Sequence, residues 1–436
     1  MTVPSYFAQK PPCFVRHPDL PASCVRSTST SGAPVKATTS AGRYPPGYYL
    51  IVGLPTLLFS GATAVRIMRL LSALMSCALL ASAFESAIGY ADNRLMLGLA
   101  VAITPMALFL AGMVNPNGLE IASAIGLWSA GYQLMTGPAL QPIRRLVMRA
   151  AISAAVLVQC RGASLVWLAT ILCVLAALAE RGRLRMLMRA RIVQMWGILA
   201  AASSAFALWW LVTFDSLAIQ RVGPRLHESF LLRLDAAAGE TGSFIQQMVG
   251  TLGWLDVPPP LATVILWLGA LTALVLLAVY SGPVRQTVVL GALALYVVVV
   301  PVVVDAYTAP RTGLIWEGRY TLPIASGIAV LAAGNSRLTA VSPRISGWLR
   351  VLIPAALCVA QIGLFLTALR RYAVGANGPF WPTGGPWSPP LGVLAALLTF
   401  VFAVGAYSAW VSYLARSQGG TGSPWGRARG LVQSGR

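Results

Sequence analysis

Long apolar runs constrain the fold of this chain more than any other feature. Eleven runs approach the roughly 20 mostly apolar residues that a helix needs to cross a bilayer. Of 436 residues only 10% are charged, whereas soluble domains are about a quarter charged. The sequence therefore excludes a single soluble globule and predicts an all-α fold, a polytopic transmembrane helical bundle of about 11 spans. The predicted spans are 63–84, 93–113, 118–135, 143–160, 162–180, 193–214, 260–281, 284–304, 319–334, 346–369 and 391–415.

Arginine sets the predicted orientation. The net charge is +20, and thirty of the 32 basic residues are arginines. With residues 1–62 outside, the linkers on the other face carry seventeen arginines and have three acidic residues in or beside them, which fits the positive-inside rule. Because these basic residues are scattered over many turns, nucleic acid is not an expected partner. We expect a multi-pass protein of the bacterial plasma membrane with a cytoplasmic C-terminus. The linkers on the cytoplasmic face are 85–94, 136–149, 181–191, 282–286, 335–350 and 416–436.

The predicted organisation has three parts. Residues 1–62 form an external N-terminal segment, residues 63–415 the transmembrane helical domain, and residues 416–436 a disordered cytoplasmic tail. The external segment contains no signal peptide and no transmembrane span. It also carries five basic residues, so without a preceding helix it would be hard to translocate across the membrane. Either a first helix precedes Met1 or the orientation is reversed, and we favour the former. Cys13 and Cys24 lie in this segment, where a disulfide is permitted, while the other cysteines lie in spans.

Two further external features could take part in function. Residues 215–259 contain two amphipathic pieces, which we interpret either as a structural lid or as a cap over a cavity. Arg66 and Arg69 lie one turn apart near the start of a long apolar helix, where a charge is costly unless it pairs or faces a polar cavity. They would either reach the membrane interface or bind an anionic head group.

Three motifs resemble a known family. The string PPGYY at 45–49, followed by a short apolar helix and an arginine that opens a long helix, resembles the first external loop of polyprenyl-phosphate-dependent glycosyltransferases of the C superfamily. The segments PMALFLAGMVNPNGLEIASA (105–124) and WEGRYTLPI (316–324) resemble motifs of domain-of-unknown-function family 2142. That family is similar to the same superfamily in architecture, and the resemblance extends from about residue 40 to about residue 410.

The resemblance implies a catalytic carboxylate that this sequence does not match. In the superfamily it follows the first transmembrane helix, whereas this chain begins inside the corresponding loop. The catalytic residue is therefore unknown, with Glu120 and Asp256 as weak candidates. Glu240 is a further weak candidate from the 215–259 segment. No His or Cys cluster has metal-ligand spacing, so no metal site is predicted, and a divalent cation stays open as a cofactor.

Arginines on the external face are the candidates for binding the leaving phosphate, because the planar guanidinium binds phosphate through two hydrogen bonds. Arg319 and Arg43 are preferred, and Tyr44 and Tyr320 adjoin them. Arg319 could instead form a structural ion pair with Glu317 or Asp305. The complete predicted substrate-binding set is Arg43, Tyr44, Arg66, Arg69, Asn115, Asn117, Trp254, Glu317, Arg319 and Tyr320.

The NPNGLE string at 115–120 fits an external turn that opens a helix. Asn115 and Asn117 suit turn positions, and Glu120 would lie near the positive end of the helix dipole. Glu120 either stabilises that helix end or faces a cavity, where it would bind a sugar hydroxyl, a cation or Arg319. Trp254 either stacks on a sugar or anchors the chain at the membrane interface.

Three functions follow from these features. The first is an integral-membrane glycosyltransferase that moves a hexose or pentose from a polyprenyl-phosphate donor to a cell-envelope glycan or lipid on the external face. The second is a transporter or flippase of lipid-linked sugars, and the third is an inactive membrane scaffold. A transporter usually shows discontinuous helices or repeated halves. Because the chain shows no internal repeat and few charges within its spans, we favour the transferase.

Overall fold

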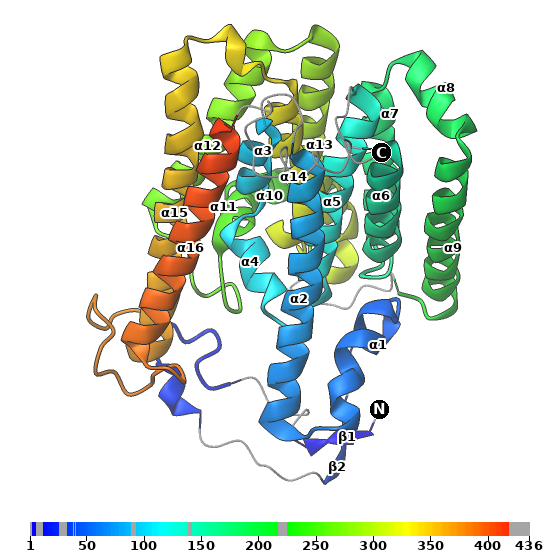
Figure 1. Cartoon of the computed structure of the whole chain (residues 1–436). Helices are drawn as coiled ribbons and strands as arrows, with labels where there is room; N and C mark the ends of the chain where they lie inside the picture. Colours follow the sequence, from blue (N-terminus) through cyan, green and yellow to red (C-terminus); the bar gives the residue numbers. More distant parts are fainter. Residues whose placement is uncertain are drawn as a thin grey trace, which may run out of the picture.

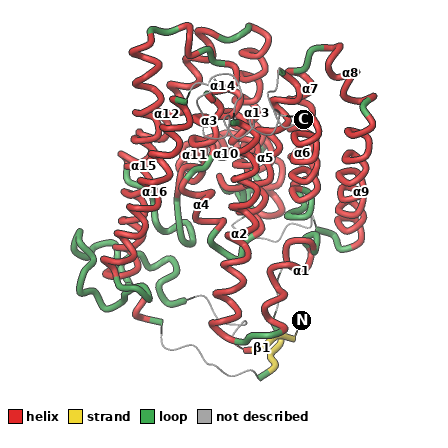
Figure 2. Tube along the Cα trace, viewed as in Figure 1, coloured by secondary structure: helices red, strands yellow, loops and turns green. Residues whose placement is uncertain are grey.

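A computed structural model shows a bundle of long helices that run side by side (Figures 1 and 2). It describes residues 2–5, 12–25, 33–37, 39, 41–88, 93–137, 142–216 and 225–417. The predicted tail lies outside the described residues from position 418 onward. The helices are α1 (Gly47–Gly53), α2 (Gly61–Ala87), α3 (Leu95–Ala102), α4 (Pro105–Ala111), α5 (Pro116–Thr136), α6 (Ile143–Leu157), α7 (Ser164–Leu178), α8 (Arg181–Arg189), α9 (Arg191–Thr213), α10 (Phe230–Gly239), α11 (Thr241–Gly250), α12 (Leu261–Ser281), α13 (Val284–Thr312), α14 (Gly318–Asn335), α15 (Pro343–Val374) and α16 (Val393–Arg416).

Each of the eleven apolar runs forms helix, which confirms the predicted helical bundle. Among the described residues, six helices are long and apolar enough to cross a membrane: α2, α9, α12, α13, α15 and α16. The others are shorter, as in α6 and α7, or are buried among their neighbours, as in α5. Two short strands, β1 (Thr2–Pro4) and β2 (Pro34–Lys36), pair antiparallel in the N-terminal segment.

The predicted span 93–113 is wrong as a single helix. The chain forms α3 and α4 with a break at Ile103 and Thr104. Pro105 has no backbone N–H and disfavours helical backbone in the residue before it, and the Thr104 side chain caps α4 by accepting a hydrogen bond from the backbone N–H of Ala107. A proline that directly follows a Thr in an apolar run is therefore the signal for this break.

Helix α5 forms the centre of the bundle and is buried along almost its whole length between α2, α6 and α14. Its Trp128 indole N–H donates to the backbone carbonyl of Pro323, and its Tyr132 hydroxyl donates to Asn335, both at 3.0 Å. These two bonds hold α5 against α14. Since the first bond joins the middle of α5 to the first half of α14 and the second joins their C-terminal ends, the two helices run parallel and begin at the same end of the bundle.

Arginines at the opposite end bind the exposed carbonyls where helices finish. Arg94 donates to Gly334 at the end of α14, at 2.8 Å, and Arg183 donates to Leu134 near the end of α5. Arg285 donates to Ala177 and Ala179 at the end of α7, at 2.6 Å each. A cation is favourable there because the last carbonyls of a helix carry partial negative charge.

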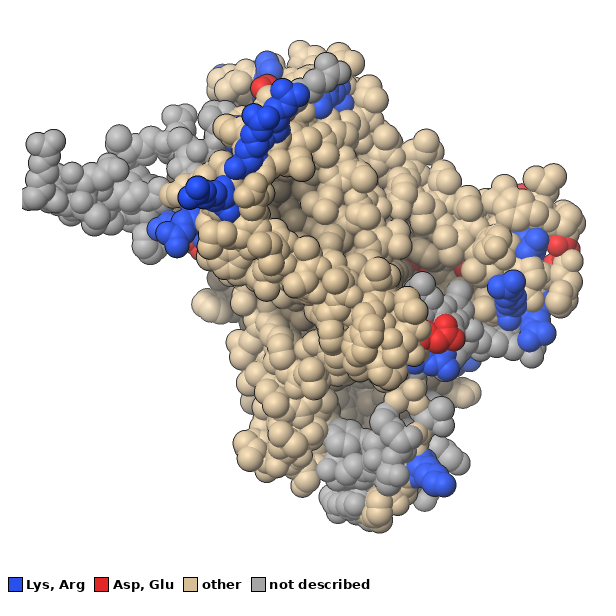
Figure 3. Space-filling model, turned by 90° about the vertical axis from the view of Figure 1, so that its right-hand side faces the viewer, with Lys and Arg blue, Asp and Glu red and all other residues tan. Residues whose placement is uncertain are grey.

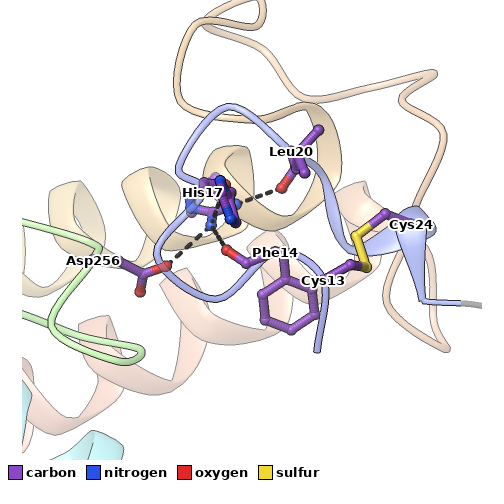
Figure 4. Close-up of a disulfide and its surroundings, with 7 residues drawn as sticks. Cys13, Phe14, His17, Leu20, Cys24 and Asp256 are labelled. Carbon is purple, nitrogen blue, oxygen red and sulfur yellow. Dashed lines mark hydrogen bonds and ion pairs between the residues drawn. A yellow bond between two sulfur atoms is a disulfide. The ribbon is translucent and has the colours of Figure 1, made fainter. Parts of the chain in front are cut away.

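A disulfide between Cys13 and Cys24 closes a loop of the N-terminal segment against α15 and the 252–257 turn (Figure 4). Arg371 of α15 donates hydrogen bonds at 2.7–3.0 Å to the backbone carbonyls of Phe14, His17 and Leu20. The sequence permitted this disulfide, and the structure forms it.

Candidate functional site

A cavity of about 180 Å³ opens where α5 and α14 begin. Four segments distant in sequence meet there: the entry to α1, the α4–α5 turn, the α6–α7 turn and the first turn of α14. Five of the residues that the sequence predicted to bind substrate line this cavity: Tyr44, Asn115, Asn117, Arg319 and Tyr320. Ala41, Tyr49, Val114, Pro116 and Arg161 complete its wall.

Two glycines bring these segments together. A Cβ atom at Gly118 would lie 2.5 Å from the carbonyl oxygen of Leu110, and one at Gly318 would lie 2.2 Å from that of Phe244. Such distances are closer than real side chains allow, so α5 reaches α4 and α14 reaches α11 only because both positions lack a side chain. The glycines in the NPNGLE and WEGRY strings therefore set the shape of the site.

The loop before α14 is held by buried hydrogen bonds. The carboxylate of Asp305, fully buried on α13, accepts bonds at 3.0 Å from the backbone N–H groups of Ile315 and Trp316. Gln247 of α11 accepts a bond at 2.8 Å from the backbone N–H of Gly318. Asp305 thus positions the loop and forms no ion pair with Arg319.

Arg319 forms its ion pair with Glu317, one of the two partners proposed from the sequence. Both side chains remain 24% exposed, and the buried Nε of Arg319 has no hydrogen-bond partner among the described residues. The ion pair with Glu317 therefore does not use all the hydrogen-bond donors of the Arg319 guanidinium group, which lines the cavity.

Arg161 was not identified from the sequence, yet it lines the cavity and contacts three of the predicted residues, Asn117, Tyr44 and Tyr320. It lies in the α6–α7 turn, donates to the Asn117 side chain at 2.9 Å, and stacks at 4.2 Å from the ring centre of Tyr320 and 5.6 Å from that of Tyr44. The one signal in the sequence is that this arginine lies in a short turn on the face predicted to be external, where the positive-inside rule makes arginine uncommon.

Glu120 lies behind Arg161 and is completely buried. Its Oε1 accepts a 2.7 Å hydrogen bond from Ser164, and Ser164 in turn accepts one at 3.1 Å from the backbone N–H of Arg161. Glu120 therefore contacts the α6–α7 turn and lies outside the cavity lining. Its charged neighbour is Arg161, whereas the sequence analysis considered Arg319 for that role.

The ionisation of the cavity wall follows from this arrangement. Burial opposes the charged form of Arg161, but the Glu120 carboxylate and the Tyr320 and Tyr44 hydroxyls outweigh it and raise the pKa of Arg161 above its ordinary value. Burial also raises the pKa of Tyr49. The cavity wall therefore keeps the positive charge of Arg161 and holds Tyr49 as a neutral phenol.

Three helices begin at the cavity. Asn115 caps α5 by accepting a 3.0 Å hydrogen bond from the backbone N–H of Asn117, Arg319 and Tyr320 lie in the first turn of α14, and Arg161 precedes α7 by three residues. Each helix start carries partial positive charge from the helix dipole, while the backbone N–H groups of Asn117 and Gly318 are already bonded within the protein. Together with two guanidinium groups, these helix starts form a site suited to an anion.

The other predicted residues lie elsewhere. Arg66 and Arg69 are exposed on α2, and Arg69 donates to the carbonyl of Gly112 at 2.9 Å. Arg43 adjoins the cavity without lining it, and its carbonyl accepts hydrogen bonds from Trp210 and Ser216.

Asp256 and Trp254 lie in the 252–257 turn, outside the cavity lining. The Asp256 side chain is 8% exposed and pairs with Arg371 at 3.0 Å, whereas Trp254 is 60% exposed. Within the described parts of the chain, no group of three or more His, Cys, Asp or Glu residues could hold a metal ion.

Comparison with known proteins identifies the family. No curated protein matches the chain. Among solved structures, ArnT from Cupriavidus metallidurans in the apo state is similar, with 14% sequence identity, a TM-score of 0.43, and a match that covers 86% of this chain and 67% of that one. A family model described as "Predicted membrane protein (DUF2142)" matches residues 8–328. The chain, a multi-pass helical membrane protein, therefore belongs to the DUF2142 family, as its NPNGLE and WEGRY strings indicated.

Proposed function

We propose that the cavity binds the phosphate of a polyprenyl-phosphate sugar, and that the protein transfers the sugar to a cell-envelope glycan or lipid at the external face of the bacterial plasma membrane. The observation that carries this proposal is the presence of Arg161 and Arg319 on one cavity at the starts of three helices. A phosphate that leaves during sugar transfer carries negative charge, and such groups stabilise it.

The remaining wall suits the sugar. Tyr44, Tyr49 and Tyr320 present rings and hydroxyl groups, and Asn115 and Asn117 present amides. A sugar needs both, because its C–H faces pack on aromatic rings while its hydroxyl groups require hydrogen-bond partners. None of the cavity-lining residues within the described chain is an Asp or Glu, so the base that activates the acceptor is not assigned.

This function fits the division of the chain predicted from the sequence. In that predicted division, residues 1–62 and 215–259 form the external part around the site. Residues 63–415 form the transmembrane domain, and the C-terminus is cytoplasmic. The arginines that bind helix ends lie at the end of the bundle away from the cavity, as this orientation requires.

Release of polyprenyl phosphate tests the proposal. The full chain in proteoliposomes is supplied with a panel of polyprenyl-phosphate sugars and acceptors, and the free lipid phosphate is measured. Arg161→Ala and Arg319→Ala should each lower release by at least tenfold, whereas Arg311→Ala, which removes an exposed arginine from the end of α13, should leave it unchanged. Folded protein that releases no lipid phosphate with any donor would contradict the proposal.

One observation favours a second candidate, a flippase of lipid-linked sugars. The break between α3 and α4 is a helix discontinuity inside the bundle, a feature common in transporters. A fluorescent lipid-linked sugar in the same vesicles separates the two functions, because a flippase would move it between leaflets without releasing lipid phosphate.

A further inference from the structure

Helix α8 is an amphipathic helix between α7 and α9. Its Leu187 is buried against Leu134 of α5 and Leu146 of α6. On its outer side, Met186 is 52% exposed and Met188 is 66% exposed. Arg185 and Arg189 are exposed beside them and lie one turn apart. The outer side of α8 therefore presents two cations and two flexible apolar side chains with no protein partner in the described chain.

The connection to α9 fixes the depth of α8 in the membrane. Only Ala190 separates the two helices, and α9 is one of the six membrane-spanning candidates. Within the 18-residue apolar stretch of α9, just 11% is buried inside the protein. Met195 and Ile198 near the start of α9 are 66% and 68% exposed. Since α9 faces lipid from its first turns, α8 lies at the level where head groups meet acyl chains.

The charged side chains on this surface are mostly arginines, so the surface is positively charged. Arg191 at the start of α9 and Arg144 and Arg145 at the start of α6 are exposed near α8, and α6 packs on α9. Figure 3 looks onto the side of the molecule where α8 and α9 lie and shows a row of basic side chains across its upper part, with few acidic ones. Within the described part of α8 and its two flanking residues, Glu180 is the one acidic residue.

A cavity completes the surface. It has a volume of about 540 Å³ and is lined by Gly182, Arg185, Met186, Arg189 and Ala190. Arg185 and Arg189 face it from successive turns, so both guanidinium groups can bind one phosphodiester, while Met186 offers an apolar contact to the chain below.

We propose that this surface, formed by Arg185, Met186, Met188 and Arg189 of α8, binds the head group of an anionic phospholipid in the leaflet at the arginine-rich end of the bundle. The proposal does not depend on the chemistry at the other end. It assigns a role to four residues that neither contact the sugar-phosphate cavity nor bind a helix end.

Native mass spectrometry of the full chain in detergent tests this site. The protein is titrated with dioctanoyl phosphatidylglycerol or with zwitterionic dioctanoyl phosphatidylcholine, and inorganic phosphate is added as a competitor. The test variant is Arg185→Gln/Arg189→Gln. The matched control is Arg337→Gln/Arg344→Gln, which removes the same charge from two exposed residues near the start of α15.

The wild type should bind phosphatidylglycerol in preference to phosphatidylcholine. The α8 variant should lose about thirtyfold in affinity for phosphatidylglycerol, from the contribution of two arginines at a charged membrane surface, while the control keeps the wild-type affinity. Equal binding of both lipids, an equal loss in both variants, or displacement of the lipid by an equal concentration of phosphate would each overturn the proposal. Thermal unfolding of both variants checks that the fold is retained.

Discussion

Substitution of Arg371 by Met tests the attachment of the N-terminal loop to the bundle. Arg371 is 3% exposed, pairs with Asp256 and donates to three carbonyls of the loop that the disulfide closes. Methionine replaces the aliphatic stem of arginine with an apolar chain of similar width but removes the charge and all donors. The substitution therefore leaves the Asp256 carboxylate buried without a cation.

The expected loss can be worked out from burial. Removal of one partner of a buried ion pair lowers the free energy of unfolding by about 3–5 kcal/mol. For a chain of 436 residues that unfolds cooperatively, about 1 kcal/mol corresponds to about 1 °C, so the melting temperature should fall by about 3–5 °C. The loop should also become sensitive to protease, because the carbonyls of Phe14, His17 and Leu20 lose the side-chain donor that Arg371 supplies.

Tryptophan fluorescence during heating and limited proteolysis in detergent measure both effects. The matched control is Arg370→Met, since the neighbouring Arg370 donates to a single carbonyl, that of Gly378, and forms no ion pair within the described residues. The double substitution Asp256→Asn/Arg371→Met should recover about 0.5–3 kcal/mol relative to Arg371→Met, because it also removes the unpaired charge. If Arg371→Met unfolds at the same temperature as Arg370→Met, or if the double substitution is no better than the single one, the buried pair does not stabilise the loop.

Three further outcomes are expected. Replacement of Cys13 and Cys24 by Ser should lower the free energy of unfolding by about 3 kcal/mol in non-reducing buffer, because the disulfide closes a loop with a sequence separation of 11 residues and so restricts the unfolded chain. Wild-type protein in reductant should melt at the same temperature as this variant. Gly318→Ala should lower sugar-phosphate binding at least tenfold, because the new methyl group would collide with the carbonyl of Phe244 and displace the start of α14; unchanged binding would show that α11 can move away. Glu120→Gln keeps the hydrogen bond from Ser164 and removes only the charge, so it should strengthen lipid-phosphate binding, because Arg161 loses a competing negative neighbour, while leaving the melting temperature within about 2 °C of wild type; unchanged binding would show that Arg161 does not contact the phosphate.

The sequence predicted the helices well because apolar runs act locally. Runs such as 260–281 and 284–304 correspond to α12 and α13 almost to the residue at their starts. Where a local signal competes with the run, the prediction fails: Pro105 divides the apolar stretch 93–113 into two helices. The length of α13 was also underestimated, because the helix continues through Pro301 and Pro310 to Thr312.

The grouping of residues around the cavity has a different physical reason. The NPNGLE and WEGRY strings bring Asn115, Asn117, Arg319 and Tyr320 to one cavity because each string also defines a helix start, and their role in binding stays a prediction. The residues next to Arg161 in the sequence do not show that it lines the cavity, because its contact with Tyr320 joins segments more than 100 residues apart in the sequence.

The arginines that bind the ends of α5, α7 and α14 link the insertion of the chain into the membrane to the packing of its helices. In the orientation predicted from the sequence, Arg94, Arg183 and Arg285 belong to the charges that would direct insertion of the chain, and in the structure the same guanidinium groups join one helix to the next. A change that neutralised them to alter the direction of insertion would also remove bonds between finished helices. In that orientation, the direction of insertion and the closure of the bundle depend on the same three side chains.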